Sequence, residues 1–246
     1  MSITLGKRLA KIESMVTAGY DHIWDCCCDH GLLGAQLLTR QAAPCIHFVD
    51  RVPALMGDLE QKLLRFCPLQ PTQLPTPPSV QAPIKGSSEW HLHCLDVATL
   101  PLQQHAGRHL VIIAGVGGDL MIQLVSAIHS AHPTADIDFL LCPVHHQFAL
   151  RQQLIRLGFG LRNEALVEEN RRCYEILLLC TPAARCQAAD SISPVGNQLW
   201  RAASATETKI ASDYLDKTLR HYKRIQQGNK ADVQHIIRAY QAVTVA

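Results

Sequence analysis

Residues 22–50 read HIWDCCCDHGLLGAQLLTRQAAPCIHFVD. Two short apolar runs, at 22–26 and 45–49, flank a polar loop and a helical pattern at about 32–40. Short apolar runs that alternate with helical patterns are typical of the strands of a βαβ unit. This stretch therefore predicts the start of a parallel sheet, and the residues on either side extend it.

The same alternation continues to about residue 180. Further strands are expected at 90–95, 109–114, 138–142, 161–167 and 173–180, with helices at 53–66, 120–129 and 147–157. An amphipathic helix precedes the first strand and is expected to stop near Gly19. Seven strands with intervening helices predict an α/β fold with a doubly wound, Rossmann-like sheet.

Two stretches depart from this alternation, and a different pattern follows the second. Residues 68–88, within the sheet region, are rich in proline and are expected to form a loop, and a polar linker is expected much later, at 182–196. Beyond it, Ser204 and Glu207 have capping-box spacing, and two apolar stripes predict a pair of helices. We therefore predict two domains, a sheet domain at 1–190 and a helical hairpin or coiled-coil domain at 191–246.

Charge is distributed unevenly between these parts. The chain has a net charge of +2, but residues 1–194 carry −2 and residues 195–246 carry +4. The tail is therefore predicted to bind a polyanion, although a solvated helix surface is the alternative. The candidate RNA-binding residues are Lys7 and Arg8 of the leading helix and Lys217, Arg220, Lys223 and Arg224 of the tail.

Composition excludes several classes of protein. With 48% hydrophobic and 18% charged residues, the sequence indicates a soluble globular chain, and no apolar stretch approaches the roughly 20 residues of a membrane span. Charges near the start oppose a secretory signal, and the ten cysteines include three in a row. We expect a cytoplasmic protein, with a monomer favoured. Because no two cysteines have CxxC spacing, no metal site is predicted.

Polar residues follow the expected strands, where ligands bind in open α/β sheets. The loop at 25–31 would bring backbone N–H groups and a helix N-terminus to a ligand. Asp50 would accept hydrogen bonds from ribose hydroxyls, and Asp96 from an adenine amino group. These features predict an adenosine-containing cofactor. The candidate cofactor-binding residues are Asp25, Cys27, Asp29, His30, Gly31, Asp50, Arg51, Asp96, Val97, Ala114 and Gly115.

Two common cofactors contain adenosine, NAD and S-adenosylmethionine. NAD would need a GxGxxG loop for its pyrophosphate, and the chain offers only Gly31 and Gly34 there. The acidic loop at 25–29 also repels phosphate, whereas it tolerates an ammonium group and a sulfonium cation. S-adenosylmethionine is favoured, and an NAD-dependent oxidoreductase remains the enzymatic alternative.

Several of these segments resemble those of the bacterial tRNA (adenine-22-N1)-methyltransferases. The resemblance is carried by Lys7-Arg8-Leu9, Asp25, Asp29-His30, Ile-Ala-Gly-Val-Gly-Gly at 113–118, and residues 150–159, 164–169 and 174–176. This chain has Cys27 where the family usually has glycine, Val116 where it has methionine, and Cys-Pro-Val-His at 142–145 where Gln-Pro-Asn is expected. These departures suggest a divergent member.

The resemblance implies a class I methyltransferase fold followed by a helical domain, with S-adenosylmethionine as cofactor and tRNA as partner. It implies N1-methylation of adenine 22. The glycine-rich loop, with Gly115, Val116 and Gly117, would receive the base, and His145 could orient it. Two alternatives stay open. One is an RNA-binding or scaffold protein with a decayed cofactor site, and the other is a methyltransferase that acts on another RNA or a small molecule.

Overall fold

The computed structural model describes residues 4–67, 88–184, 189–228 and 231–246. These residues form an eight-stranded sheet of order β3-β2-β1-β4-β5-β7-β6-β8. Its first five strands pair in parallel, whereas β7 and β6 run antiparallel to their neighbours. The strands are β1 (His22–Cys26), β2 (Cys45–Asp50), β3 (Glu89–Cys94), β4 (His109–Ala114), β5 (Ile137–Cys142), β6 (Gly160–Glu169), β7 (Arg172–Cys180) and β8 (Asp190–Ser191).

The α/β prediction is confirmed, with one addition. The two-residue strand β8 pairs antiparallel with β6, within the stretch expected to be a polar linker. Its two residues are too few to produce a periodic pattern, so no strand was predicted there. The proline-rich loop expected at 68–88 lies outside the described residues apart from Ser88.

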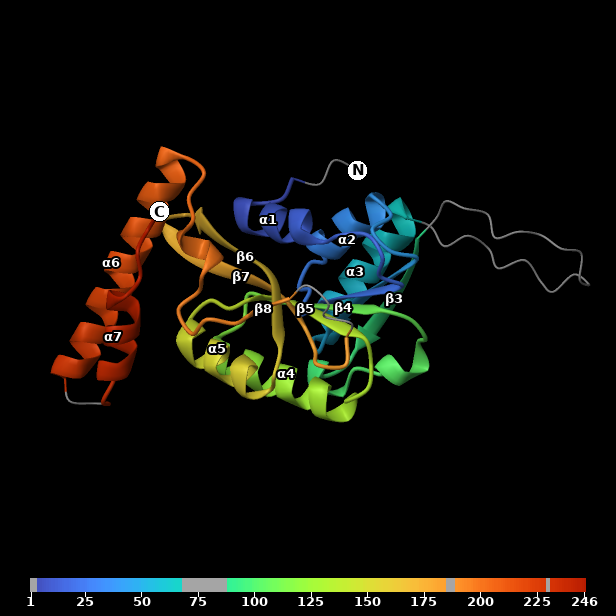
Figure 1. The fold of residues 1–246 in the computed structure, drawn as a ribbon. Helices are drawn as coiled ribbons and strands as arrows, with labels where there is room; N and C mark the ends of the chain where they lie inside the picture. Colours follow the sequence, from blue (N-terminus) through green and yellow to red (C-terminus); the bar gives the residue numbers. More distant parts are fainter. Residues whose placement is uncertain (1–3, 68–87, 185–188, 229–230) are drawn as a thin grey trace, which may run out of the picture.

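Helices cover both faces of the sheet (Figure 1). On one face lie α1 (Lys7–Met15), α2 (Leu32–Thr39) and α3 (Pro53–Phe66), and on the other α4 (Gly118–Ala131) and α5 (Gln147–Arg156). Two 3-10 turns, η1 (Val97–Thr99) and η2 (Leu102–Gln104), connect β3 to β4. Each face has its own apolar cluster, so the central strands are buried on both sides.

The predicted helical hairpin is present at the end of the chain. After η3 (Gln198–Trp200), α6 (Ala205–Gln227) and α7 (Gln234–Gln241) lie side by side beyond β6 and β7 (Figure 1). The Ser204 half of the predicted capping box forms, because its hydroxyl accepts from the Glu207 amide at 3.2 Å, while Glu207 accepts from the amide of Ala203, one residue before the N-cap, at 2.7 Å. The division into domains at 1–190 and 191–246 stays a prediction.

A buried charge network ties this hairpin to the sheet. Arg151 of α5 donates to Glu175 of β7 at 2.8 Å and to Glu164 of β6 at 2.6 Å, and all three side chains are inaccessible to solvent. The Tyr214 hydroxyl of α6 donates to the second oxygen of Glu175 at 2.6 Å. Buried charges need partners of this kind, so these residues, which carry part of the family resemblance, position α6.

Histidine rings occupy one side of the sheet towards the amino-terminal ends of β1, β2 and β4. Trp24 is fully buried and stacks on His47, with 3.7 Å between ring centroids. Burial, followed by repulsion from four neighbouring imidazoles, lowers the pKa of His47 to about 2. That ring is therefore neutral at pH 7.

The described helices offer no candidate for a membrane span, because none is both long and apolar enough.

Candidate active site

The loops that follow the parallel strands meet at the carboxyl edge of the sheet. They are residues 27–31 after β1, 51–52 after β2, 95–96 after β3, 115–117 after β4 and 143–146 after β5. β1 and β4 lie side by side in the sheet. From β1 the chain continues through β2 and β3 towards one edge, and from β4 it continues through β5 towards the other, so the strand order reverses between β1 and β4. A crevice at such a point is the expected ligand site of an open α/β sheet.

The loop after β1 is built from left-handed residues. Cys27 has φ 56°, Asp29 has φ 50° and Gly31 has φ 67°. At Gly31 a Cβ atom would also lie 2.6 Å from the Leu59 side chain, so glycine is required there. For cysteine or aspartate the left-handed conformation costs about 1–2 kcal/mol. The loop thus keeps a conformation at Cys27 that glycine would adopt without strain.

Asp25 lies beneath this loop and is only 4% exposed. Its Oδ2 accepts a hydrogen bond from the Gly34 amide at 2.8 Å, which anchors the first turn of α2. Burial raises the pKa of Asp25 to about 7, and the nearby Asp50 carboxylate adds to the increase. Asp25 can therefore hold a proton near neutral pH, and a cationic ligand would remove it.

Asp50 stands at the end of β2 and faces the same loop. One of its oxygens accepts from the Asp29 amide at 3.3 Å and the other from the Val52 amide at 3.0 Å. Each carboxylate oxygen can accept a second hydrogen bond. The group can therefore receive two hydroxyl donors, and its contact with ribose hydroxyls stays a prediction.

Asp96 has a local role. Its Oδ1 accepts from the Ala98 amide at 2.8 Å and so caps η1, while the Val97 side chain is buried in the core. The carboxylate is exposed, and its predicted contact with an adenine amino group stays a prediction.

Cys27 lies among the predicted acids. Burial raises the pKa of its thiol to about 11, and the charges of Asp50, Asp25 and Asp96 add to the increase while Arg51 opposes it. Four of the predicted cofactor-binding residues therefore act electrostatically on this one side chain. A thiol with this pKa is protonated at pH 7 and is not a nucleophile.

The loops after β4 and β5 are joined by backbone hydrogen bonds. Gly115 donates to the Cys142 carbonyl at 3.2 Å, Val144 donates to Val116 at 3.0 Å, and Gly118 donates to His145 at 3.0 Å. A Cβ atom at position 117 would overlap the His145 ring. The predicted residues Val116, Gly117 and His145 thus form one surface, on which His145 is exposed.

A histidine–carboxylate pair borders this surface and was not predicted as a site. His146 caps α5 with φ 59°, and its Nδ1 lies 2.7 Å from Oδ2 of Asp119 on α4. Both side chains are more than half exposed. The two residues are 27 positions apart, so only the fold brings them together.

A cavity of about 280 Å³ lies between these loops and α1. Its lining includes loop residues 25–30, Ala114, Gly115 and Val116 from the end of β4, and Arg8 and Leu9 from α1. His30 and Asp29 are exposed at this loop, 3.7 Å apart. Sequence reasoning missed Leu9 and assigned Arg8 to RNA, because the packing of α1 against the sheet edge has no local signal.

Arg8 is the distinctive side chain of this cavity. Its guanidinium lies 5.1 Å from the centroid of the Tyr174 ring, and its backbone amide donates to Glu169 at 3.2 Å. The Nε atom is buried and has no hydrogen-bond partner among the described residues. An unsatisfied buried donor costs about 1–3 kcal/mol, whereas Nη1 of the same guanidinium lies towards Gly115, which also lines the cavity.

The other predicted RNA-binding residues lie elsewhere. Lys7 is exposed and borders a groove of about 400 Å³ that also includes Lys11 and Arg201. Four exposed cations line an open hollow on α6: Lys217, Arg220, Lys223 and Arg224. Within the described parts of the chain none of these four makes an ion pair. Their charges are available to an external anion.

The chain is similar to a known protein family in sequence and to solved structures in fold. A family model described as methyltransferase domain matches residues 5–71 and 80–177. No curated protein sequence matches the chain.

Solved structures match over nearly the whole chain. The B. subtilis M1A22 tRNA methyltransferase TrmK is 18% identical with a TM-score of 0.67, covering 98% of this chain and 94% of that one. M. capricolum TrmK in complex with S-adenosyl-homocysteine is 13% identical with a TM-score of 0.67, and 96% of each chain is covered. A Streptococcus agalactiae protein of the NADB-Rossmann superfamily is 15% identical with a TM-score of 0.72, covering 98% and 97%. At these identities the likeness shows the fold, and it confirms the family resemblance at that level.

Proposed function

Because the chain belongs to the methyltransferase domain family, we propose that it transfers a methyl group from S-adenosylmethionine to N1 of an adenine in tRNA. The predicted target is adenine 22. The fold is shared with two TrmK enzymes, of which one is described as an M1A22 tRNA methyltransferase and the other binds S-adenosyl-homocysteine. A cytoplasmic location and a monomeric state remain predictions.

The observation that carries this proposal is the Arg8 guanidinium, which lines the cavity at the β1–β4 crevice and has its Nη1 3.7 Å from where a Cβ atom at Gly115 would stand. S-adenosylmethionine has a carboxylate for this donor, a ribose diol for Asp50 and an ammonium group for Asp25. The Asp50 carboxylate can accept further hydrogen bonds, and a nearby cation would favour the ionised form of Asp25. The residues present therefore fit the cofactor.

The residues of the chain would mainly orient the reactants. S-adenosylmethionine supplies an electrophilic methyl group when bound. Gly115 leaves room beside it, Gly117 lets the His145 ring pack close, and Val116 and Val144 offer an apolar surface for a planar base. His145 can donate to or accept from the base edge. Since N1 of adenine carries a lone pair, positioning and exclusion of water suffice, and no strong general base is needed.

The tRNA substrate is supported by the free cations of α6. Phosphate contacts by Lys and Arg provide most of the sequence-independent affinity for nucleic acid. N1 of a paired adenine is hidden, so the nucleotide must be presented unpaired or flipped out. Lys7 lies on α1, the helix that also supplies Arg8 to the cavity.

A calorimetric titration with S-adenosylmethionine tests the cofactor site. We expect one-to-one binding that Asp50→Ala and Arg8→Gln each weaken at least about tenfold, since hydrogen bonds to charged groups contribute about 1.5–3 kcal/mol. Asp58→Ala, an exposed acid on α3, is the matched control and should bind normally. Absence of binding would favour an RNA-binding scaffold, and binding of NAD alone would favour an oxidoreductase.

Methyl transfer to unmodified tRNA transcripts tests the substrate. We expect incorporation that is lost when adenine 22 is replaced by another base, and a reverse-transcription stop at that position. Transfer that persists after the replacement would assign another nucleotide. Cofactor binding without transfer to any tRNA would point to another RNA or a small molecule.

A further inference from the structure

A cluster of imidazoles covers one side of the sheet at the end opposite the cavity. Parallel register places His22 of β1 beside Cys45 of β2, and the same register places Trp24 beside His47. The cluster consists of His22, His47, His91, His93, His105 and His109. Side-by-side polar rings are unusual on the inner surface of a parallel sheet, which is ordinarily aliphatic.

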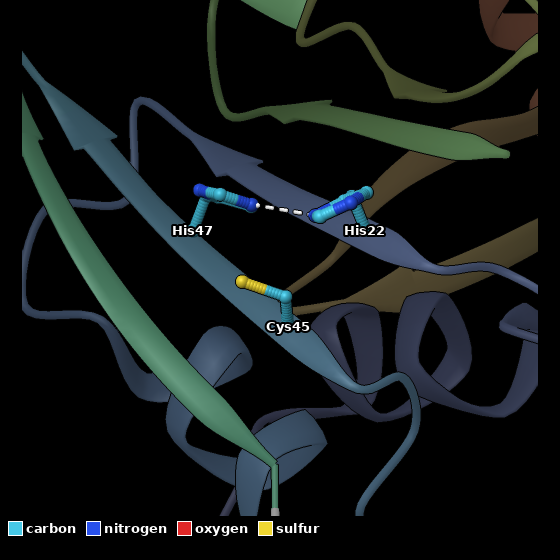
Figure 2. A group of neighbouring side chains, drawn as sticks. All are labelled: His22, Cys45 and His47. Atoms are coloured by element: carbon cyan, nitrogen blue, oxygen red, sulfur yellow. Dashed lines mark hydrogen bonds between the residues drawn. The ribbon is translucent and has the colours of Figure 1, made fainter. Parts of the chain in front are cut away.

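Three side chains of this cluster converge. Nδ1 of His22 and Nε2 of His47 are 3.0 Å apart, and the Cys45 sulfur lies within 4.8 Å of both (Figure 2). We propose that His22, Cys45 and His47 bind a zinc ion. No metal was predicted from the sequence because no cysteines have CxxC spacing and no His/Cys cluster has finger-like spacing, whereas these ligands come from two neighbouring strands.

The donor set suits this metal. Zinc binds imidazole nitrogen at about 2.0–2.1 Å and thiolate at about 2.3 Å, usually with four tetrahedral ligands. Two nitrogens on a tetrahedral zinc are then about 3.3 Å apart. The two rings would separate by a few tenths of an ångström, and the Cys45 sulfur would move inward.

The outer nitrogens of both rings have partners. Nε2 of His22 lies 3.2 Å from the Ala106 carbonyl, and Nδ1 of His47 lies 2.9 Å from Nε2 of His93. A histidine that binds a metal usually donates its other N–H to such a partner, which fixes its tautomer and orientation. Both candidate ligands therefore already have the second contact that a zinc site requires.

Access and a fourth ligand are also present. His47 and Cys45 are buried, but His22 is half-buried and His91 is exposed, so an ion can reach the cluster from solvent. The His105 ring lies 4.7 Å from the His47 ring and 5.0 Å from the His22 ring. Its ring could turn towards the ion to complete a fourth position, which water would otherwise fill.

The metal would have a structural role. The ligands join the amino-terminal ends of β1 and β2, and the outer contact to Ala106 adds the connection to β4. The cavity lies at the carboxyl ends of the same strands. Binding should therefore raise stability and leave affinity for S-adenosylmethionine unchanged, which makes this inference independent of the proposed function.

Metal titration of the full-length, chelator-treated protein tests the site, with Co²⁺ as a spectroscopic probe for Zn²⁺. We expect one Co²⁺ per chain, a thiolate-to-metal charge-transfer band and the visible bands of a tetrahedral ion, all displaced by Zn²⁺. Cys45→Ser should abolish the charge-transfer band. His22→Gln, at a half-buried position, should weaken Zn²⁺ binding at least about tenfold, and His93→Gln by about 10- to 100-fold.

Matched controls and thermal unfolding complete the test. Cys67→Ser and His221→Gln remove a free cysteine and an exposed histidine elsewhere, and both should bind as the native chain does. Zn²⁺ should raise the Tm of the native chain and of the controls more than that of His22→Gln. The proposal is overturned by the absence of stoichiometric metal, or by binding that Cys45→Ser and His22→Gln both retain. Either result would leave a hydrogen-bonded imidazole cluster only.

Discussion

At the scale of single residues, the left-handed Cys27 strains the loop after β1, where we propose that the cofactor binds. Its φ of 56° is strained for an L residue, and its thiol stands among the acids that would receive the cofactor. Cys27→Gly should therefore increase the free energy of unfolding by up to about 1 kcal/mol and tighten binding of S-adenosylmethionine several-fold.

Two controls separate the causes of this effect. Cys28→Gly changes a neighbour whose φ is not positive, and it should destabilise because glycine adds freedom to the unfolded chain. Cys27→Ala removes the thiol but keeps the strain. Denaturant unfolding and calorimetry measure stability and binding in the three variants. If Cys27→Gly were no more stable than Cys27→Ala, the left-handed conformation at position 27 would not be strained.

Asp25 makes stability depend on pH. Its pKa is about 7 in the folded protein against 3.8 for the free side chain, so the native state holds a proton that the unfolded state has lost. Stability from this group therefore falls as pH rises from about 4 to about 7 and is constant above that range. Asp25→Asn keeps the acceptor for the Gly34 amide, and it should remove this part of the pH dependence.

Chemical unfolding between pH 5 and pH 8 measures the difference between the two proteins. Subtracting the Asp25→Asn profile isolates this carboxyl from all other groups. Parallel profiles for the two proteins would show that Asp25 ionises normally. The same variant should also reduce proton release on binding of S-adenosylmethionine, since the cationic ligand favours ionised Asp25.

Residues at strand ends were predictable, whereas residues brought in by packing were not. Asp25 and Asp50 follow apolar runs, and the topology of a parallel sheet places such residues together. Arg8 lies on a helix that precedes the sheet, and its position in the cavity depends on how α1 packs. The Asp119–His146 pair and the His22–Cys45–His47 group depend on register and loop pairing in the same way.

At the scale of elements, the junction between the hairpin and the sheet depends on Glu175. This carboxylate accepts from Arg151 of α5 and from the Tyr214 hydroxyl of α6, and it is fully buried. Removing one partner of a buried charge pair typically costs about 3–5 kcal/mol. Glu175→Gln should therefore lower the free energy of unfolding by an amount in this range.

Denaturant unfolding checks this value, and Lys209→Ala is the control. Lys209 pairs with Asp213 on the exposed face of α6, where an ion pair contributes little. Equal stability of Glu175→Gln and the native chain would mean that Arg151 is satisfied by Glu164 and the Ser193 carbonyl alone. The Ser204 cap of α6 and the bounds of α3 were predictable because local signals define them, whereas this network joins four elements.

At the scale of the whole molecule, the hairpin cannot be removed cleanly to test RNA binding. Its apolar cluster includes Phe148 of α5, and Leu166 and Cys173 of the sheet pack against it. Deletion would expose these residues together with the buried charges of Arg151 and Glu175. Point changes on the outer face of α6 are therefore the sharper test of its role.

The triple variant Lys217→Ala, Arg220→Ala, Arg224→Ala should weaken tRNA binding and leave binding of S-adenosylmethionine unchanged. These three cations are exposed and unpaired within the described residues, so their loss should not destabilise the fold. Each lost phosphate contact reduces the slope of log K against log salt by about 0.7–0.9. Binding measured over a series of salt concentrations should therefore show a slope shallower by about 2 in the variant.

Lys209→Ala, on the same helix but ion-paired with Asp213, should keep the native slope. An unchanged slope in the triple variant would place the RNA elsewhere, with the groove beside Lys7 and Lys11 as the next surface to change.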